Sequence, residues 1–238
     1  MMSDFVYRCI KRVFDVIASF FALIVLIPIW IIAIVGIEIS DPGPVFYMAN
    51  RVGKDNKPFR MFKFRSMKVD RNADEKNFKA DKNRIFKWGE ILRSTKIDEL
   101  PQLLNVFFGQ MSVIGPRPAS SDQVAITRAG KYAAISTLKP GLSGPSALYD
   151  YIYGDQIEDE EEYKKKVLPT RLDLDLYYIN AKSLTYDIKM TWYTVVCIFG
   201  LVFKRFPQWM YNELIEAART VGKDEEFNLE HDTVSYRR

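Results

Sequence analysis

The sequence of 238 residues has little of the residue types that most often carry metal sites and nucleophilic catalysis: one histidine and two cysteines. His231 lies in a polar C-terminal stretch, and Cys9 and Cys197 are far apart, in or beside apolar segments. A Ser-His-Asp triad, a Cys-His pair, a zinc site and a disulfide framework are therefore not expected. Any chemistry has to use carboxylates and cations, and a reducing compartment suits the two thiols.

The sequence also lacks a strong charge imbalance and internal repeats. The formal net charge of +4 is compatible with a basic face for lipid or nucleotide phosphates, but no stripe of Lys and Arg indicates nucleic acid. The length is enough for one sizeable domain and short for two. We expect one main domain and no nucleic-acid partner.

Residues 16–37 contain no charged side chain in 22 positions, which is long enough to span a bilayer as a helix. Pro28 interrupts this segment and predicts a kink. Arg8, Lys11 and Arg12 precede it and place the N-terminus on the cytoplasmic side. A spanning helix would send the rest of the chain outside, whereas a helix that bends at Pro28 and returns keeps both flanks on the cytoplasmic face. Both interpretations stay open on these residues alone.

Beyond a Pro-Gly breaker at 41–44, residues 45–48 and 59–64 predict the strands of a small β-hairpin. Residues 68–84 are polar and predict a loop, and 85–93 predict a helix. Pro101 is expected at the first position of a helix over 102–108, where the helix dipole would lower the pKa of the preceding carboxylates.

The C-terminal half is expected to be helical, with Glu160–Glu162 four residues before Lys164–Lys166 on a solvated face. Residues 190–203 are charge-free but only 14 long, which favours an interfacial helix over a buried core helix. Side chains suited to lipid headgroups lie in and after it: Trp192, Tyr193, Lys204, Arg205, Trp209 and Tyr211.

The predicted fold is α+β and mainly helical, in a monotopic membrane protein with a kinked re-entrant N-terminal helix, a small β-hairpin and interfacial amphipathic helices. Residues 1–40 would form the membrane helix and 41–206 a cytoplasmic domain. Residues 207–238 would form a C-terminal helix and a tail.

Between residues 63 and 118, two adjacent carboxylates are interleaved with fixed cations. They are Asp98 and Glu99, with Lys63, Arg65, Arg93 and Arg117. A carboxylate can act as nucleophile or metal ligand, and arginines bind phosphate oxygens in pairs. Singly, most of these residues have ordinary interpretations as helix caps or as surface ion pairs worth under about 1 kcal/mol. Together they predict chemistry on a phosphate diester, with Arg117 pre-organised between two prolines.

In the order and spacing of its motifs over about residues 8–200, the chain resembles the bacterial sugar transferase family, the monotopic phosphoglycosyl transferases. The matching stretches are KRVFD at 11–15, GPVF at 43–46, RVG at 51–53, KFRSM at 63–67, LRST at 92–95, DELPQL at 98–103, NV at 105–106, GPRP at 115–118 and KPGLSG at 139–144. The resemblance implies a re-entrant helix and transfer of a phosphosugar from a UDP-sugar to a polyprenol phosphate, with release of UMP and dependence on Mg²⁺. It also implies that Asp98 is the nucleophile, forming an aspartyl phosphosugar that undecaprenyl phosphate resolves, and that Glu99 assists and helps to hold the metal.

Many family members have Ser-Pro at the helix break, whereas this chain has Ile27-Pro28, and the bend is still expected. The chain is expected to be the small form of the family, without a polytopic N-terminal region. We expect it at the cytoplasmic face of the bacterial inner membrane, with UDP-sugar, undecaprenyl phosphate and membrane lipids as partners and downstream glycosyltransferases as further ones.

Two alternatives stay open. In direct transfer Asp98 is only a metal ligand and the polyprenol phosphate itself attacks the UDP-sugar. In the other, the chain is a membrane-anchored lipid-binding or scaffolding protein without catalysis. No motif identifies the sugar, and residues 142–158, with Tyr149, Tyr151 and Tyr153, are the candidates for contacting it.

Overall fold

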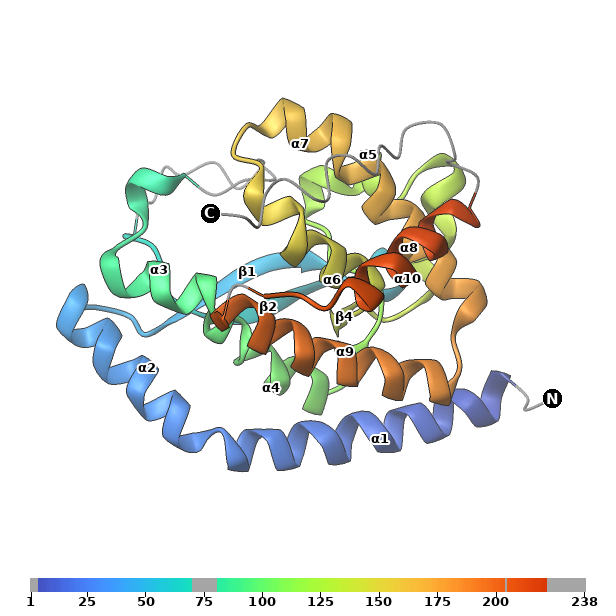
Figure 1. The fold of residues 1–238 in the computed structure, drawn as a ribbon. Coiled ribbons are helices and arrows are strands. Elements are labelled where there is room, and N and C mark those ends of the chain that lie inside the picture. Colours follow the sequence, from blue (N-terminus) through green and yellow to red (C-terminus); the bar gives the residue numbers. More distant parts are fainter. Residues whose placement is uncertain (1–3, 70–80, 204, 222–238) are drawn as a thin grey trace.

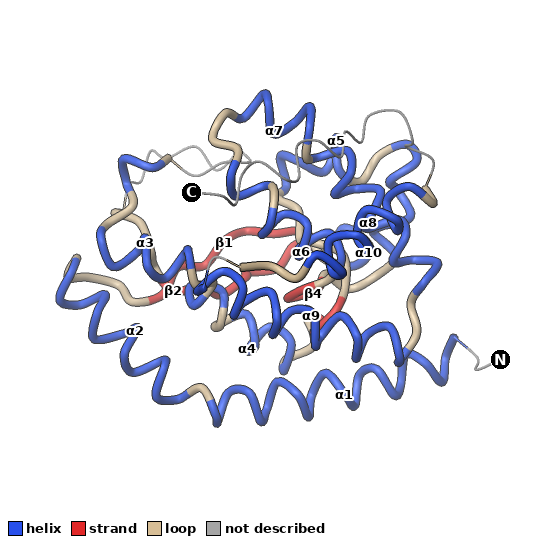
Figure 2. Tube along the Cα trace, in the orientation of Figure 1, coloured by secondary structure: helices blue, strands red, loops and turns tan. Residues whose placement is uncertain are grey.

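The computed structural model describes residues 4–69, 81–203 and 205–221, and it is mainly helical (Figure 1). Its strands form two small two-stranded sheets that lie among the helices (Figure 2). The predicted α+β, mainly helical class is confirmed. Part of the loop expected at 68–84, Lys204 and the tail from residue 222, with His231, lie outside the described residues, as does the side chain of Tyr211. The division into three parts at residues 40 and 206 stays a prediction.

Two helices, α1 (Asp4–Val25) and α2 (Ile27–Ser40), form the N-terminal part and run along one side of the molecule (Figure 1). They are bent by 60° relative to each other. Pro28 lies at the start of α2, where it cannot donate a backbone hydrogen bond to the preceding turn. The kink predicted at Pro28 is confirmed.

The predicted hairpin is confirmed, although its first strand is longer than expected. Strand β1 (Phe46–Val52) pairs antiparallel with β2 (Pro58–Phe64). The turn contains the short 3₁₀ helix η1 (Lys54–Asn56), in which Asp55 and Asn56 have φ angles of 54° and 56°. Asp and Asn tolerate this left-handed region better than other residues with a side chain, which lets the two strands close tightly.

Three short helices follow the hairpin and carry most of the predicted site. They are α3 (Lys87–Ser94), the 3₁₀ helix η3 (Ile97–Glu99) and α4 (Gln102–Phe107). The helix expected at 85–93 is therefore confirmed with a small shift. Pro101 has helical angles, φ −61° and ψ −17°, but occupies the cap position just before α4 rather than its first residue.

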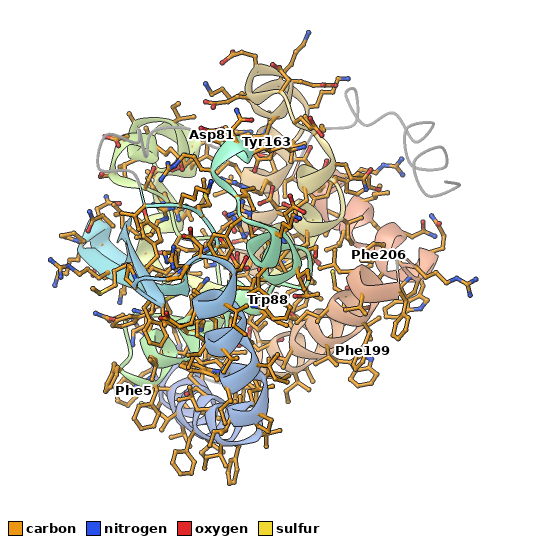
Figure 3. All side chains as sticks on the ribbon, turned by 90° about the vertical axis from the view of Figure 1, so that its left-hand side faces the viewer. Phe5, Asp81, Trp88, Tyr163, Phe199 and Phe206 are labelled. Atoms are coloured by element: carbon orange, nitrogen blue, oxygen red, sulfur yellow. The ribbon has the colours of Figure 1, made fainter. Side chains whose placement is uncertain are left out.

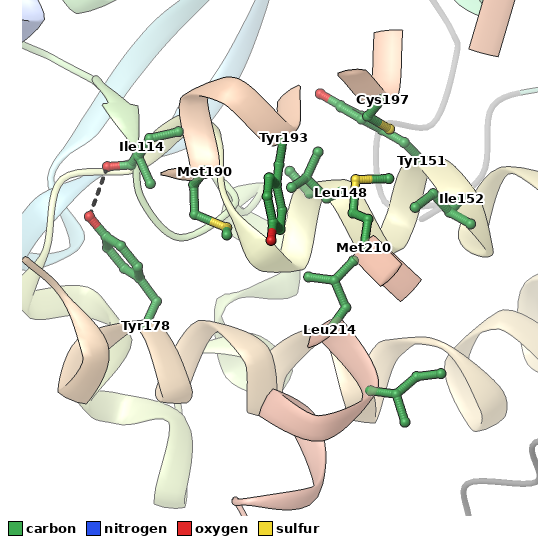
Figure 4. Close-up of a cluster of buried hydrophobic side chains, with 12 residues drawn as sticks. Ile114, Leu148, Tyr151, Ile152, Tyr178, Met190, Tyr193, Cys197, Met210 and Leu214 are labelled. Carbon is green, nitrogen blue, oxygen red and sulfur yellow. Dashed lines mark hydrogen bonds between the residues drawn. The ribbon is translucent and has the colours of Figure 1, made fainter. Parts of the chain in front are cut away.

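Among the described residues, the largest buried cluster contains Ile114, from a parallel strand pair, and side chains of four helices (Figure 4). The pair is β3 (Ser112–Ile114) with β4 (Gly141–Ser143), and the helices are α6 (Pro145–Ile152), α8 (Leu168–Ala181), α9 (Leu184–Phe203) and α10 (Gln208–Arg219). The hydroxyl group of Tyr178 on α8 donates to the carbonyl oxygen of Ile114 at 3.3 Å and ties a helix to the strand pair.

The remaining elements are short: α5 (Val124–Thr127), α7 (Glu160–Lys166) and the 3₁₀ helices η2 (Lys82–Arg84), η4 (Ser121–Gln123), η5 (Gly130–Thr137) and η6 (Gly154–Gln156). In α7 the predicted pairs form, with Lys164 2.9 Å from Glu160 and Lys166 2.8 Å from Glu162. The prediction of a solvated charged helix is confirmed there.

Helix α9 is long and apolar enough to cross a membrane, and α1 with α2 passes the same test of length and composition only as a bent pair. Helix α9 begins at Leu184, six residues before the charge-free segment at 190–203, and therefore has 20 residues rather than 14. One face packs into the core, and Tyr193 belongs to that buried face instead of the surface. The opposite face leaves apolar side chains exposed: Ile188, Trp192, Val195, Phe199 and Val202. Phe199 points away from the molecule in Figure 3.

Helix α3 is held against the segment after β2 by a contact that only glycine permits. A Cβ atom on Gly89 would lie 2.0 Å from the carbonyl oxygen of Ser66, a backbone atom. Gly89→Ala should therefore lower the free energy of unfolding by about 1–3 kcal/mol, because either the helix or the backbone has to move. Thermal unfolding in detergent measures this, with the exposed Lys87→Ala on the same helix as control. Equal melting temperatures for the two variants would contradict this packing.

Candidate active site

Five of the six predicted site residues line one cavity of about 740 Å³. Lys63 comes from β2 and Arg93 from the last turn of α3, while Asp98 and Glu99 lie in η3 and Arg117 follows β3. The volume is in the range of small-molecule sites, about 300–1,000 Å³. The structure thus gathers two carboxylates and three cations, far apart in sequence, around one space.

Arg65 is the sixth predicted residue, and it does not line this cavity. Strand β2 ends at Phe64, and the buried Arg65 guanidinium instead donates to the side chain and carbonyl oxygen of Asp41 and to the carbonyl oxygen of Pro44. These contacts join the end of α2 to the hairpin. The geometry assigns Arg65 a structural role, and the expected phosphate contact has no support from its position.

Both carboxylate oxygens of Glu99 are engaged within the protein. Oε1 accepts from the Lys63 ammonium at 3.1 Å, and Oε2 accepts from the Tyr151 hydroxyl group at 2.9 Å. Burial acts to raise the pKa of Glu99, but the positive charges of Lys63 and Arg117 outweigh it and hold the pKa well below its usual range. Glu99 therefore stays ionised and fixes the Lys63 side chain at the cavity wall.

Asp98 is in a different position, although it is the neighbouring residue. Its side chain is buried, and its Oδ1 atom has no hydrogen-bond partner among the described residues. Burial, with the negative charge of Glu99, raises the pKa of Asp98 against the opposing effects of Lys63 and Arg93. The expectation that the pKa of Asp98 is lowered is wrong, because desolvation of the buried carboxylate is the largest effect on it. An unpaired buried carboxylate oxygen is costly, and such groups occur where function needs them.

Arg117 is held by acidic residues that no motif had indicated. Its Nε atom lies 3.2 Å from Oδ2 of Asp150, and its backbone N–H donates to Oδ1 of Asp175 at 3.2 Å. Asp150 is buried and also accepts from the Tyr163 hydroxyl group at 2.6 Å. Despite its burial, its pKa is lowered by Arg117 and Arg171. The sequence pointed to Asp150 only through its place in residues 142–158, the segment proposed to contact the sugar.

The three tyrosines that were candidates for contacting the sugar all contact other side chains of the protein. Tyr151 donates to Glu99, and its ring lies under the cations of Lys96 and Arg117, 4.3 and 5.7 Å from the ring centroid. Tyr149 and Tyr153 pack against each other with ring centroids 4.8 Å apart. Tyr151 supports the charged groups of the site instead of lining it.

Lys96 is a lining residue that the sequence had not distinguished from a surface lysine. It has a left-handed backbone with φ 58°, unusual for a residue with a side chain, directly before η3. Its ammonium forms an ion pair with Asp155. Lys96 joins Lys63, Arg93 and Arg117 as a cation that acts on Asp98 or Glu99, and its backbone has a strained conformation of the kind found at functional sites.

The described residues contain no group of three or more His, Cys, Asp or Glu side chains that could hold a metal ion on their own. Mg²⁺ commonly uses one or two carboxylates and completes its shell with substrate phosphates and water. The free Oδ1 atom of Asp98 fits such a shared site. Glu99 fits it less well, because both of its oxygens already accept hydrogen bonds.

The opposite pKa shifts predict opposite effects of two similar substitutions. The raised pKa means that ionised Asp98 disfavours folding above its unfolded pKa of about 3.9, so Asp98→Asn should keep or raise the melting temperature at pH 7. The lowered pKa means that Glu99 contributes stability above its unfolded pKa of about 4.3, which is lost as pH falls through the lower folded pKa.

Glu99→Gln should therefore lower the melting temperature at pH 7. The difference in melting temperature between Asp98→Asn and Glu99→Gln should narrow as the pH falls below about 4.3. Thermal unfolding of both proteins across this pH range is the measurement. Equal losses of stability in the two variants at pH 7 would contradict the assigned charge states.

Comparison with known proteins places this arrangement in a family. A 38% identical relative from Klebsiella pneumoniae, UDP-glucose:undecaprenyl-phosphate glucose-1-phosphate transferase, aligns over 82% of this chain and 40% of its own length. UDP-N-acetylgalactosamine-undecaprenyl-phosphate N-acetylgalactosaminephosphotransferase of Aeromonas hydrophila is 32% identical over 80% of this chain and 44% of its own. The exopolysaccharide production protein PSS of Rhizobium leguminosarum is 35% identical over 79% of this chain and 94% of its own.

The chain thus spans about two fifths of the first of these relatives, 40% of its length, and nearly all of the last. The sequence model of the family described as bacterial sugar transferase matches residues 6–200, which include both carboxylates and every cation of the cavity. The resemblance seen in the motifs is confirmed. This chain belongs to the bacterial sugar transferase family.

Proposed function

We propose that this protein transfers a sugar 1-phosphate from a UDP-sugar to undecaprenyl phosphate, releases UMP and so begins the assembly of a lipid-linked glycan. Family membership and the names of the relatives support this reaction class. The observation that carries it is the free Oδ1 atom of the buried Asp98, in a cavity lined by Lys63, Arg93 and Arg117. An anionic oxygen without a partner, surrounded by cations, suits attack on a phosphorus atom whose own oxygens the cations bind.

In the proposed reaction the Asp98 carboxylate attacks the sugar-bearing phosphorus atom. A P–O bond forms to Asp98, the P–O bond to the bridging oxygen breaks, and UMP leaves with that oxygen. A phosphate oxygen of undecaprenyl phosphate then attacks the same phosphorus atom and frees the carboxylate. Lys63, Arg93 and Arg117 would bind the non-bridging phosphate oxygens in both steps, and Glu99 would hold Lys63 in place.

Mg²⁺ would be held by Asp98 together with the diphosphate of the substrate, and it would supply neutralisation of phosphate charge. Glu99 would join this shell only by giving up a bond to Lys63 or Tyr151. The protein's own part is to keep Asp98 dry and to position the cations. Burial of Asp98 does the first, and the contacts of Glu99 and Asp150 do the second.

The proposed location is the cytoplasmic face of the bacterial inner membrane, with α1 and α2 as a re-entrant pair. The bend of 60° supports this, as does the return of α2 to the catalytic part, where the Trp88 indole donates to the carbonyl oxygen of Ala33 at 3.3 Å. The exposed apolar face of α9 and the exposed Trp209 would lie at the membrane interface. Nucleotide substrates are then on the same side as the cavity, and downstream glycosyltransferases would meet the product there.

Asp98→Asn tests the proposal, because an amide keeps the shape of the side chain but is not an anionic nucleophile. The purified protein, undecaprenyl phosphate and a panel including UDP-glucose and UDP-N-acetylgalactosamine should give UMP, and the variant should lose it by about a thousandfold or more. Without undecaprenyl phosphate, the unaltered protein should gain the mass of one phosphosugar on Asp98, found by mass spectrometry. Glu99→Gln should be severely impaired.

Each alternative predicts a different result. UMP release that requires undecaprenyl phosphate, with no adduct on Asp98, would establish direct transfer. Failure of every UDP-sugar to give UMP would leave a lipid-binding role for the cationic cavity. Near-normal UMP release by Asp98→Asn would remove Asp98 as the nucleophile.

Arg117→Lys tests the phosphate contact. The ammonium keeps the charge but cannot bind two oxygens in one plane, so UMP release should fall by about tenfold to a hundredfold. Arg60→Lys is the matched control, since Arg60 is exposed on β2 and does not line the cavity. Unchanged activity in Arg117→Lys would leave Arg117 only its structural bond to Asp150.

Single cysteines at Ser3 and at the exposed Lys165, in a chain whose two native cysteines are replaced, test the topology. Both should react only from the cytoplasmic side. Pro28→Leu restores the missing backbone donor and should straighten the helix, so that some molecules expose position 3 to the periplasm. Periplasmic labelling of position 3 in the chain with native Pro28 would establish a spanning helix and exclude the re-entrant pair.

A further inference from the structure

A second cavity, of about 260 Å³, lies apart from the site of the proposed reaction. It is formed by the N-terminal part of α1, the hairpin turn η1, strand β3, the segment between η5 and β4, and the end of α8. None of its lining residues lines the first cavity. The second cavity therefore has no part in the proposed phosphosugar transfer.

Six of the fourteen residues that line the second cavity are basic. The cationic lining residues are Arg8, Lys11, Arg12, Lys54, Lys139 and Lys182, and the acidic ones are Asp4 and Asp15. Three of these cations have acidic partners: Arg8 lies 2.9 Å and Lys182 3.5 Å from Asp4, and Lys11 lies 2.8 Å from Asp187. The other three cations, Arg12, Lys54 and Lys139, therefore decide the charge of the cavity.

Lys54 and Lys139 are half-buried, and their ammonium groups make no hydrogen bond or ion pair with any residue that the structure describes. Arg12 is fixed by the carbonyl oxygens of Val106 and Phe107, each 2.7 Å away, which orient its guanidinium without neutralising it. Among the described residues, the acidic group that attracts Lys139 is Asp15. Its Oδ1 atom is already bonded to the strand β3, where it accepts from the Ser112 hydroxyl group and the Val113 N–H.

The pKa of Lys139 is lowered by burial and by the positive charges of Arg12 and Lys54, which outweigh the attraction of Asp15. Lys139 thus lies close enough to both Arg12 and Lys54 to be repelled by them. Groups of like charge are kept together at a cost, and an anion among them would remove that cost. A tetrahedral phosphate, with several acceptor oxygens, suits a set of one guanidinium and two ammonium groups.

The surroundings point to the source of that phosphate. Tyr7, Leu138 and Tyr178 provide apolar area in the wall of the cavity. On the same part of α1, Phe5, Ile10 and Val13 are 70%, 42% and 58% exposed, and Phe5 projects outward in Figure 3. A cationic pocket beside exposed apolar side chains matches an amphiphile whose phosphate is bound while its acyl chains lie along the helix.

We propose that the second cavity binds the phosphate group of an anionic membrane lipid, with Lys54 and Lys139 as its direct ligands and Arg12 as the fixed third charge. The bound headgroup would hold the hairpin turn and the start of α1 at one depth in the membrane surface. Because this site shares no residue with the proposed reaction, it stands or falls separately from the transferase activity.

Protection of the two lysines tests the site on the full chain in an uncharged detergent. The probes are dihexanoyl phosphatidylglycerol, dihexanoyl phosphatidylcholine and inorganic phosphate, and acetylation of each lysine by an amine reagent is followed by mass spectrometry. Phosphatidylglycerol should slow acetylation of Lys54 and Lys139 severalfold. Lys57 is the internal control, because it lies in the same turn, is exposed and does not line the cavity. Phosphatidylcholine, whose headgroup carries its own cation, should protect less.

The variant Lys54→Gln/Lys139→Gln should bind phosphatidylglycerol about tenfold more weakly or worse, whereas Lys57→Gln should bind it unchanged. Thermal unfolding of each variant checks that it is folded. Equal protection of all three lysines would overturn the site, and so would unchanged binding by the double variant. Protection by inorganic phosphate as strong as by phosphatidylglycerol would overturn the lipid assignment.

Discussion

The burial of two adjacent carboxylates constrains everything around them. Neither Asp98 nor Glu99 can be ionised inside a protein without cations nearby, and each cation then needs a support of its own. The two carboxylates differ in their hydrogen-bond partners. Glu99 takes Lys63 and the Tyr151 hydroxyl group for its two oxygens, while an oxygen of Asp98 is left with no partner among the described residues. Glu99 holds its neighbours in place, and Asp98 keeps an oxygen atom free for the proposed reaction.

The supports of the cations explain why so much of the chain is needed to build a small cavity. Arg117 depends on Asp150, which in turn is positioned by Tyr163 and by Gly154, where a Cβ atom would lie 2.1 Å from the Asp150 carboxylate. Arg93 depends on α3, whose approach depends on Gly89. These contacts join helices from both halves of the sequence, so loss of packing far from Asp98 would displace the cations around it and weaken the proposed reaction.

The sequence predicted what is local and missed what is formed between distant segments. The kink at Pro28, the hairpin and the charged helix α7 follow from residue type and spacing, and the structure has them. The parallel pairing of β3 with β4 and the bond from Asp150 to Arg117 join separate segments, and no periodicity shows them. Arg65 was predicted to bind phosphate because it shares a motif with Lys63, whereas the structure pairs its guanidinium with Asp41. The pKa of Asp98 was misjudged because burial cannot be read from a helix start.

In the proposed reaction, the pKa of Asp98, already raised by burial, would also respond to the charges that enter the cavity with the substrate. A diphosphate entering beside two carboxylates would raise that pKa further, since like charges disfavour ionisation. The cations of Lys63, Arg93, Lys96 and Arg117, with a metal ion carried by the diphosphate, would oppose this effect. Asp98 would then be most reactive when a metal-bound nucleotide fills the cavity and less so when the cavity holds water alone. In the proposed reaction, Asp98 would therefore become a strong nucleophile only after the UDP-sugar has entered the cavity.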